Sequence, residues 1–141
     1  MSQGLEIQAF KPGDIPQVRG LWAQCEGLGD GPGDSEVGLA RFLARNPGLS
    51  AVARQGGEIV GAALCGHDGR RGFLYRVGVS PAHRRQGIAQ ALVTHCLTGL
   101  KAEGLERSLF FVVGSNDGAK RFWGTMGAKW RKQLEIHSID L

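Results

Sequence analysis

The sequence has 141 residues, 42% hydrophobic and 21% charged, a composition ordinary for one folded domain spanning residues 1–141. It contains no apolar run near the roughly 18 residues needed to cross a bilayer and no apolar leader, which predicts a cytoplasmic protein with no membrane partner. The net charge of +4 favours an anionic partner without identifying it.

Cysteines and basic residues narrow the function classes further. Cys25, Cys65 and Cys96 are odd in number and form no Cys-x-x-Cys pair, so we expect small buried side chains rather than disulfides or a metal site. Five arginines fall within residues 70–85, and a second basic group lies within residues 120–132. Aromatic residues are only 7% and are not interleaved with these stretches, so no nucleic-acid partner is expected.

The first part of the chain has the pattern of a strand followed by two helices. Leu5–Phe10 alternates apolar and polar residues, as a strand does. Apolar residues at helical spacing predict an amphipathic helix over Asp14–Glu26, with Asp14 as its N-cap. Ser35 begins a second short helix, which ends at Pro47-Gly48.

Three strands of an antiparallel meander are predicted next. Leu49–Arg54 and Glu58–Cys65 are rich in β-forming residues, and the Gln55-Gly56-Gly57 link between them is typical of a hairpin. Gly72–Val79 is the third strand, and Pro81 ends it.

The remainder predicts helices alternating with strands. Gln86–Ala102 is the strongest helix pattern, Leu109–Val113 is expected to be a strand buried on both faces, and Ala119–Met126 a short helix. Lys129–Leu141 is expected to form one or two closing strands. The helical crossover makes Gly72–Val79 and the later buried strand parallel neighbours. The fold class is therefore α/β in the mixed α+β sense: a central mixed, twisted sheet of six or seven strands with about four helices.

The segment that carries chemistry lies where the meander runs into the long helix. It reads Val77-Gly78-Val79-Ser80-Pro81-Ala82-His83-Arg84-Arg85-Gln86-Gly87-Ile88-Ala89. The first amides of a helix have no intrahelical acceptor and carry roughly half a positive charge, which suits a diphosphate. Gly87 lets the backbone approach the anion, and Arg84 and Arg85 add positive charge. The alternative is an ordinary helix start with solubilising arginines.

Two further motifs give this segment a family context. Ser115-Asn116-x-x-Ala119-x-x-Phe122-Trp123-x-x-x-Gly127-Ala128 follows it, and Gly57-Glu58-Ile59-Val60-Gly61 precedes it. Together they resemble the GNAT superfamily of acyl-CoA-dependent N-acetyltransferases, and the element order is similar over essentially the whole chain. Gly66-x-Asp68-Gly69-x-Arg71-Gly72 is most similar to a small bacterial YpeA-like branch. The resemblance implies a parallel strand pair that is splayed at the cofactor site.

The resemblance also implies a site for acetyl-CoA as co-substrate, without a metal. Main-chain groups of Val77, Gly78 and Val79 would contact the pantetheine and the thioester carbonyl. The residues implied to cradle the pyrophosphate, mostly through backbone amides, are Arg84, Arg85, Gln86, Gly87, Ile88 and Ala89. Asn116 stands where the family often places an asparagine beside the coenzyme, and capping of the next helix is its equally weighted alternative.

The implied reaction is direct transfer of an acetyl group to a primary amine of a small molecule or a protein N-terminus. Two positions depart from the family pattern. Trp123 stands where a general-acid tyrosine is common, and indole has no usable pKa. Tyr75 stands where a glutamate base is common, so this candidate catalytic residue would order water or orient the substrate. His67, His83 and Glu26 are weaker candidates for the base.

The missing base limits the amine acceptor. Deprotonating a lysine amine of pKa about 10.4 at pH 7 costs about 4.6 kcal/mol, against about 1 kcal/mol for an α-amine near pKa 7.8. We therefore expect an N-terminus, an amino acid or an amino sugar, bound by the Gly27–Gly33 loop and the C-terminal strands. The alternative is a catalytically weak acyl-CoA-binding sensor module of the same fold. The resemblance also admits a homodimer paired through the C-terminal strands.

Overall fold

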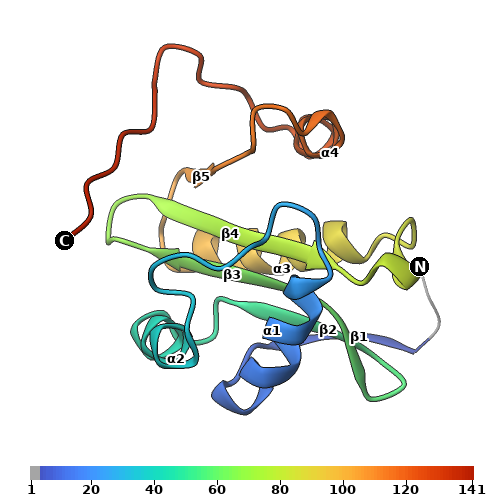
Figure 1. Ribbon diagram of the computed structural model, residues 1–141. Helices are drawn as coiled ribbons and strands as arrows, with labels where there is room; N and C mark the ends of the chain where they lie inside the picture. The colour runs from blue at the N-terminus through green and yellow to red at the C-terminus, as the bar shows by residue number, and fades with distance from the viewer. Residues whose placement is uncertain (1–3) are drawn as a thin grey trace. The chain divides into compact units, whose positions relative to one another are not determined.

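The computed structural model describes residues 4–141, and the chain divides into two compact units, one ending at Phe111 and the other comprising Val112–Leu141. The first unit holds a sheet with helices on both faces: α1 and α2 cover one face and α3 covers the other (Figure 1). The second unit holds the helix α4. No helix within the described residues is long and apolar enough to cross a membrane.

The sheet has the strand order β1-β2-β3-β4-β5 and is antiparallel except between β4 and β5, which run parallel. Its strands are β1 (Leu5–Ala9), β2 (Ala51–Gln55), β3 (Glu58–His67), β4 (Gly72–Val79) and β5 (Ser108–Phe110). The helices are α1 (Ile15–Ala23), α2 (Glu36–Arg45), α3 (Ile88–Ala102) and α4 (Asp117–Thr125), with single 3₁₀ turns η1 (Pro12–Asp14) and η2 (Pro81–His83).

The predicted element order is confirmed from β1 to α4, as are the mixed fold class and the parallel β4–β5 pair. The predicted number of strands is wrong, because the sheet has five within the described residues rather than six or seven. Lys129–Leu141 contains no strand. Its apolar side chains, such as Trp130 and Ile139, are exposed at 74% and 88%. Alternation alone cannot make a strand where no neighbouring backbone fixes a register.

Two smaller expectations also need correction. The apolar run Leu109–Val113 is not buried on both faces, since Phe111 and Val113 are 53% and 55% exposed and β5 ends at Phe110. Asp14 occupies the N-cap position of α1, but its side chain makes no capping hydrogen bond. Its carboxylate instead accepts the backbone N–H of Lys11 and pairs with Arg54 of β2, so a tertiary ion pair displaces the local cap.

The core lies on both sides of the central strands. On one face Val18 and Trp22 of α1 pack with Leu39 of α2, all at most 1% exposed. On the other face Ile88 and Leu92 of α3 are 2% and 0% exposed. Their close packing favours glycine in β3, because a Cβ at Gly61 would stand 3.0 Å from both side chains. Cys65 and Cys96 are buried, as expected, and Cys25 is half-buried.

Candidate functional site

The parallel pair separates early. Only Gly72–Leu74 of β4 pairs with β5, and β4 then continues to Val79 with no strand on that edge among the described residues. A β-bulge lies in the part of β4 that does not pair with β5. Tyr75 is opposite Leu64 and Gly78 is opposite Ala62, so two residues of β4 face one residue of β3. A bulge bends its strand and turns it away from its neighbour, which opens the edge between β4 and β5.

The open edge presents main-chain groups. Ser80 donates its backbone N–H to Val60 of β3 over 2.8 Å. Opposite residues in an antiparallel ladder alternate between hydrogen-bonded and non-hydrogen-bonded pairs. The main-chain groups of Gly78 therefore also turn toward β3, and those of Val79 turn toward the open edge. The Val79 carbonyl already accepts the Cys25 thiol and the Arg84 Nε–H over 3.6 and 3.4 Å. Its amide is therefore the group of this residue that is directed to the edge.

Gly78 allows the end of α1 to lie directly on β4. A Cβ at this position would stand 2.8 Å from Leu28 Cδ1, 3.0 Å from Trp22 Cδ1 and 3.1 Å from Cys25 Sγ. Any larger residue would force these side chains to shift away from the strand. The role that the structure gives Gly78 is thus close packing beneath the open edge.

Beyond β4 the chain enters α3 through a turn whose backbone is bent to expose amides. Arg85 and Gly87 both have positive φ, 63° and 78°. The first hydrogen bond of α3 runs from Ala91 N–H to the Gly87 carbonyl. The amides of residues 88–90, in the first turn, therefore have no acceptor inside the helix. A Cβ built on Gly87 would meet no atom within 4 Å. The helix start therefore has both the amides and the open space that an anion needs.

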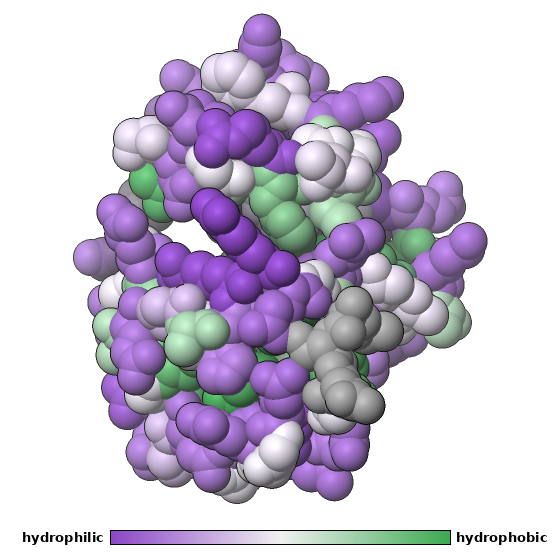
Figure 2. All heavy atoms as spheres, turned by 90° about the vertical axis from the view of Figure 1, so that its right-hand side faces the viewer, coloured by the Kyte–Doolittle hydropathy of each residue, from purple (hydrophilic) through white to green (hydrophobic). Residues whose placement is uncertain are grey.

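A shallow groove continues from this helix start along α3. Its lining residues are Gln86, Gly87, Gln90, Ala91, Thr94 and His95. The side chains of Arg84 and Arg85 are exposed beside it, whereas the Ile88 side chain is buried in the core, so Ile88 can serve a ligand only through its backbone. The face of the molecule turned to the viewer in Figure 2 is mostly hydrophilic.

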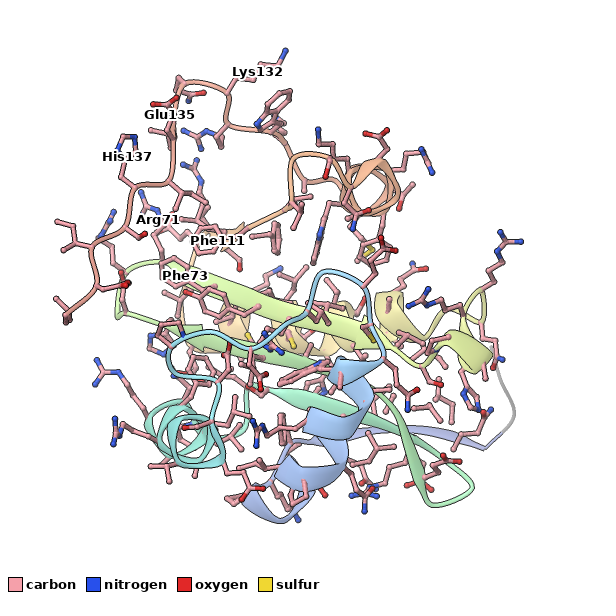
Figure 3. The ribbon with its side chains drawn as sticks, in the orientation of Figure 1. Arg71, Phe73, Phe111, Lys132, Glu135 and His137 are labelled. Atoms are coloured by element: carbon pink, nitrogen blue, oxygen red, sulfur yellow. The ribbon has the colours of Figure 1, made fainter. Side chains whose placement is uncertain are left out.

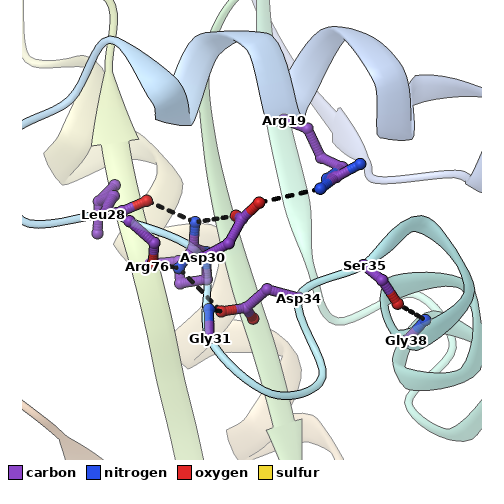
Figure 4. A network of polar contacts seen from close by, with 9 residues as sticks. Arg19, Leu28, Asp30, Gly31, Asp34, Ser35, Gly38 and Arg76 are labelled. Atoms are coloured by element: carbon purple, nitrogen blue, oxygen red, sulfur yellow. Dashed lines mark hydrogen bonds and ion pairs between the residues drawn. The ribbon is translucent and has the colours of Figure 1, made fainter.

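Arg76, at the bulge, fixes the glycine-rich loop. Its backbone has a φ of 55°, and its side chain is only 12% exposed. The guanidinium donates to the carbonyls of Leu28 and Gly29 over 2.7 and 3.0 Å. It also pairs with Asp34 at 3.2 Å and Asp30 at 3.5 Å (Figure 4). Composition alone counts this arginine toward an anion site, whereas the structure shows that it holds the loop.

The same guanidinium covers the aromatic ring of α1. Arg76 Cζ lies 4.6 Å from the centroid of the Trp22 ring. Asp30 additionally pairs with Arg19 of α1 at 2.9 Å. The loop is therefore attached to both β4 and α1, and a glycine-rich segment that could be mobile by composition has a defined position next to the open edge.

Tyr75 precedes Arg76 and belongs to an aromatic cluster. Its ring stacks on Phe73 at a centroid distance of 5.8 Å and meets Phe42 of α2 edge-on at 6.2 Å. Burial, followed by the negative charge of Asp68, raises the pKa of Tyr75 above its usual value of 10. The phenol is thus protonated at neutral pH and can donate a hydrogen bond, but it is not a base.

The weaker base candidates differ in their surroundings. His67 is engaged on both ring nitrogens: Nε2 lies 2.9 Å from Glu103 Oε1 and Nδ1 accepts the Gly69 N–H. His83 lies in η2 beside the helix start, with a buried Nδ1 that has no hydrogen-bond partner among the described residues. Glu26 is exposed after the end of α1. None of the three is placed on β4.

The second unit contains the two remaining candidates. Asn116 is the N-cap of α4, and its Oδ1 accepts the Ala119 N–H over 2.9 Å, so the structure supports the capping role of this side chain. Trp123 is half-buried and meets Phe122 edge-on at 5.0 Å. Among residues 4–141, no group of three His, Cys, Asp or Glu side chains is placed to hold a metal ion.

The chain belongs to the acetyltransferase (GNAT) family, whose model matches residues 15–128. An acetyltransferase of Photorhabdus laumondii is 39% identical over 113 residues, which cover 80% of this chain and 78% of the relative. An acetyltransferase of Pectobacterium atrosepticum is 38% identical over 136 residues, covering 96% and 90%. The expectation of an enzyme of the N-acetyltransferase class is confirmed at this level.

Solved structures share the fold. Ard1 from Thermoplasma volcanium has a TM-score of 0.79 at 21% identity, covering 89% of this chain and 82% of that one. An aminoglycoside acetyltransferase from a soil metagenomic sample, in complex with sisomicin, has a TM-score of 0.76 at 19% identity, covering 98% and 97%. The ribosomal-protein-S18-alanine N-acetyltransferase of Escherichia coli has a TM-score of 0.71 at 20% identity, covering 87% and 76%.

The contacts of Arg76 with the glycine-rich loop, called the Arg76 clamp below, yield a first prediction. Arg76→Gln removes a guanidinium that is only 12% exposed and leaves two carbonyls and Asp34 without their donor, so the free energy of unfolding should fall by about 3 kcal/mol. The matched control Arg19→Gln removes one partly exposed ion pair to the same loop and should cost less than about 1 kcal/mol. Urea unfolding measures both, and amide hydrogen exchange should accelerate in residues 27–34 of Arg76→Gln alone. Equal effects of the two variants would contradict the clamp.

Proposed function

We propose that the protein transfers an acetyl group directly from acetyl-CoA to a primary amine of low pKa. The observation that carries the proposal is that two features follow each other along the chain. The open edge of β4 ends at Val79, and one short turn later the chain reaches the start of α3 at Gly87. An extended acyl-pantetheine can add to a free strand edge by main-chain hydrogen bonds, and its diphosphate needs amides at the end of that edge. The unpaired half of β4 and the start of α3 supply these in the right order.

The coenzyme assignments follow from this arrangement. Val77 and Val79 would meet the pantetheine and thioester through main-chain groups, with Gly78 as the packing residue between them. Amides of residues 84–89 would hold the diphosphate, with Arg84 and Arg85 supplying exposed positive charge. The groove along α3 would receive the nucleotide end of the coenzyme.

The chemistry needs little from side chains once the substrates are placed. The neutral amine attacks the thioester carbonyl, the C–N bond forms and the C–S bond breaks. The nitrogen releases one proton to solvent, and the departing thiolate takes one proton from solvent. The Val79 amide, directed to the edge, would bind the carbonyl oxygen as it gains negative charge. Tyr75, protonated at neutral pH, would donate a hydrogen bond that orders water or the acceptor.

The structural neighbours are compatible with an amine acceptor. One is named for aminoglycosides and another for the alanine of a ribosomal protein, so both act on compounds that carry primary amines. Acetyl-CoA also suits a cytoplasmic setting, as do the three free cysteines.

The second candidate is an acyl-CoA-binding sensor of the same fold. The observation that favours it is the absence of a carboxylate base at Tyr75 and of a phenol acid at Trp123. One experiment separates the two: binding of acetyl-CoA by thermal shift, followed by thiol release with a panel of amines. Binding with turnover of α-amines supports the enzyme. Tight binding without turnover supports the sensor, and preference for lysine side chains would contradict the low-pKa acceptor.

The helix start provides the sharpest test of coenzyme binding. Gly87→Glu places a carboxylate in the space proposed for the diphosphate and should weaken acetyl-CoA binding at least about a hundredfold, measured by calorimetry. Gly104→Glu is a matched control, because Gly104 also has a positive φ and open space but lies after the other end of α3. It carries the same backbone strain and charge and should bind normally. Unchanged affinity in Gly87→Glu would refute the proposal that the diphosphate binds at the start of α3.

Tyr75 gives a pH prediction. Because its pKa is raised above 10, the phenol stays protonated between pH 6 and 9, and no limb of the kcat/KM profile in this range should belong to it. Tyr75→Phe should lower kcat by about tenfold or less and leave the shape of the profile unchanged. A wild-type limb that disappears in Tyr75→Phe would instead identify Tyr75 as the base.

A substitution at Trp123 tests whether acetyl transfer needs a general acid at this position. Loss of a thiol of pKa about 8.5 as thiolate at pH 7 costs only about 2 kcal/mol, so the enzyme can work without an acid. Trp123→Tyr restores a phenol at this position and should keep or raise kcat, measured as thiol release under saturating acetyl-CoA. A folded Trp123→Tyr variant with no activity would contradict the assignment of this position.

A further inference from the structure

Four aromatic rings form one surface on the α1–α2 side of the sheet. We call Phe42, Phe73, Tyr75 and Phe111 the aromatic surface. The ring centroid of Tyr75 lies 5.7 Å from that of Phe111 and 5.8 Å from that of Phe73, and the Phe73 and Phe111 centroids are 6.5 Å apart. Phe111 is 53% exposed, and the other three are half-buried. Figure 3 shows Phe73 and Phe111 near the start of β4.

The aromatic surface adjoins the open edge. Phe73 and Tyr75 project from the same face of β4 because side chains alternate along a strand. Tyr75 and Phe42 pack against the core cluster of α1 and α2, which Leu28 of the glycine-rich loop also contacts. Tyr75 is two residues from Val77 on β4, with only the bulge residue Arg76 between them. A molecule lying on these rings therefore has its reacting group within reach of the thioester position.

The carboxylates of the glycine-rich loop are already engaged. Asp30 and Asp34 of the glycine-rich loop pair with Arg76, and Asp30 also pairs with Arg19. In the turn before β4, Asp68 accepts the backbone amides of Arg70 and Arg71. The loop thus offers neither Asp30 nor Asp34 as a free carboxylate to a polycationic acceptor. Aromatic faces instead bind apolar bodies and attract a single ammonium group.

We infer that the aromatic surface is the acceptor subsite and that it selects an α-amine carried by an aromatic or other large apolar side chain. This inference rests on the proposed function and narrows its acceptor from primary amines in general to apolar amino-acid α-amines, free or at a protein N-terminus. The rings bury the apolar side chain, and the α-amine projects along β4 toward Val77 and Val79. Amino sugars and polyamines lack the apolar body that the rings cover.

A substrate panel tests the selection. With saturating acetyl-CoA, kcat/KM is measured for phenylalaninamide, glycinamide, glucosamine and spermidine by thiol release. Phenylalaninamide should exceed glycinamide by at least about tenfold, because only it buries a ring. Equal values for these two amides, or a higher value for glucosamine or spermidine, would overturn the inference while leaving acetyl transfer intact.

Variants locate the selection on the aromatic surface. Phe111→Ala removes a half-exposed ring and should raise KM for phenylalaninamide about tenfold, with KM for acetyl-CoA unchanged. Val37→Ala is the matched control, because Val37 is an apolar residue of α2 that is 69% exposed and lies outside the aromatic surface. Phe111→Leu keeps an apolar side chain without the aromatic face and should fall between the wild type and Phe111→Ala. An unchanged KM in Phe111→Ala would overturn the inference.

Binding without turnover separates this inference from the proposed function. Calorimetry follows phenylalaninamide binding to the wild type and to Phe111→Ala, each saturated with CoA. Binding that weakens about tenfold in Phe111→Ala supports the subsite even if the protein transfers acetyl to no amine, in which case only the proposed transfer fails. Absence of binding together with turnover of other amines overturns the subsite alone.

Discussion

The β-bulge at Arg76 is the constraint on which the candidate site depends. It places one arginine in the left-handed region, at a cost of about 1–2 kcal/mol. The same conformation turns the side chain inward, where it meets two carbonyls, two carboxylates and the Trp22 ring. The bend directs the following part of β4 away from β5. A single irregularity thus opens the strand edge and positions the loop beside it.

Regular elements could be predicted from the sequence because their signals are local. β4 was expected at its observed bounds. α3 begins two residues after its expected start at Gln86, because Gly87 occupies the N-cap with a positive φ that no helical residue adopts. Ser35 was expected to open α2, and its hydroxyl oxygen indeed accepts the Gly38 N–H. In each case the residues that form the element also determine where it starts or ends.

The features that could not be predicted depend on distant partners. Arg76 is indistinguishable in sequence from the arginines around it, and only the fold brings Leu28, Asp30 and Asp34 to it. Asp14 was expected to cap α1, but Arg54, forty residues later in the chain, takes its carboxylate. The closing segment 129–141 alternates apolar residues, yet a strand also needs a neighbour, which the pattern does not supply. Local patterns therefore predict the elements, whereas the site requires the long-range contacts.

The arginines look alike in the composition of the sequence but have different roles in the structure. The largely covered Arg76 side chain pairs with Asp30 and Asp34, and Arg54 pairs with Asp14. Arg84 and Arg85 remain exposed beside the start of α3. The start of α3 therefore has positive charge available to a phosphate, while the loop carboxylates Asp30 and Asp34 are engaged in ion pairs that hold the structure. The polarity of the proposed site follows from this division: an anion is held at the helix start, and the part of β4 that precedes it presents aromatic rings to the other substrate.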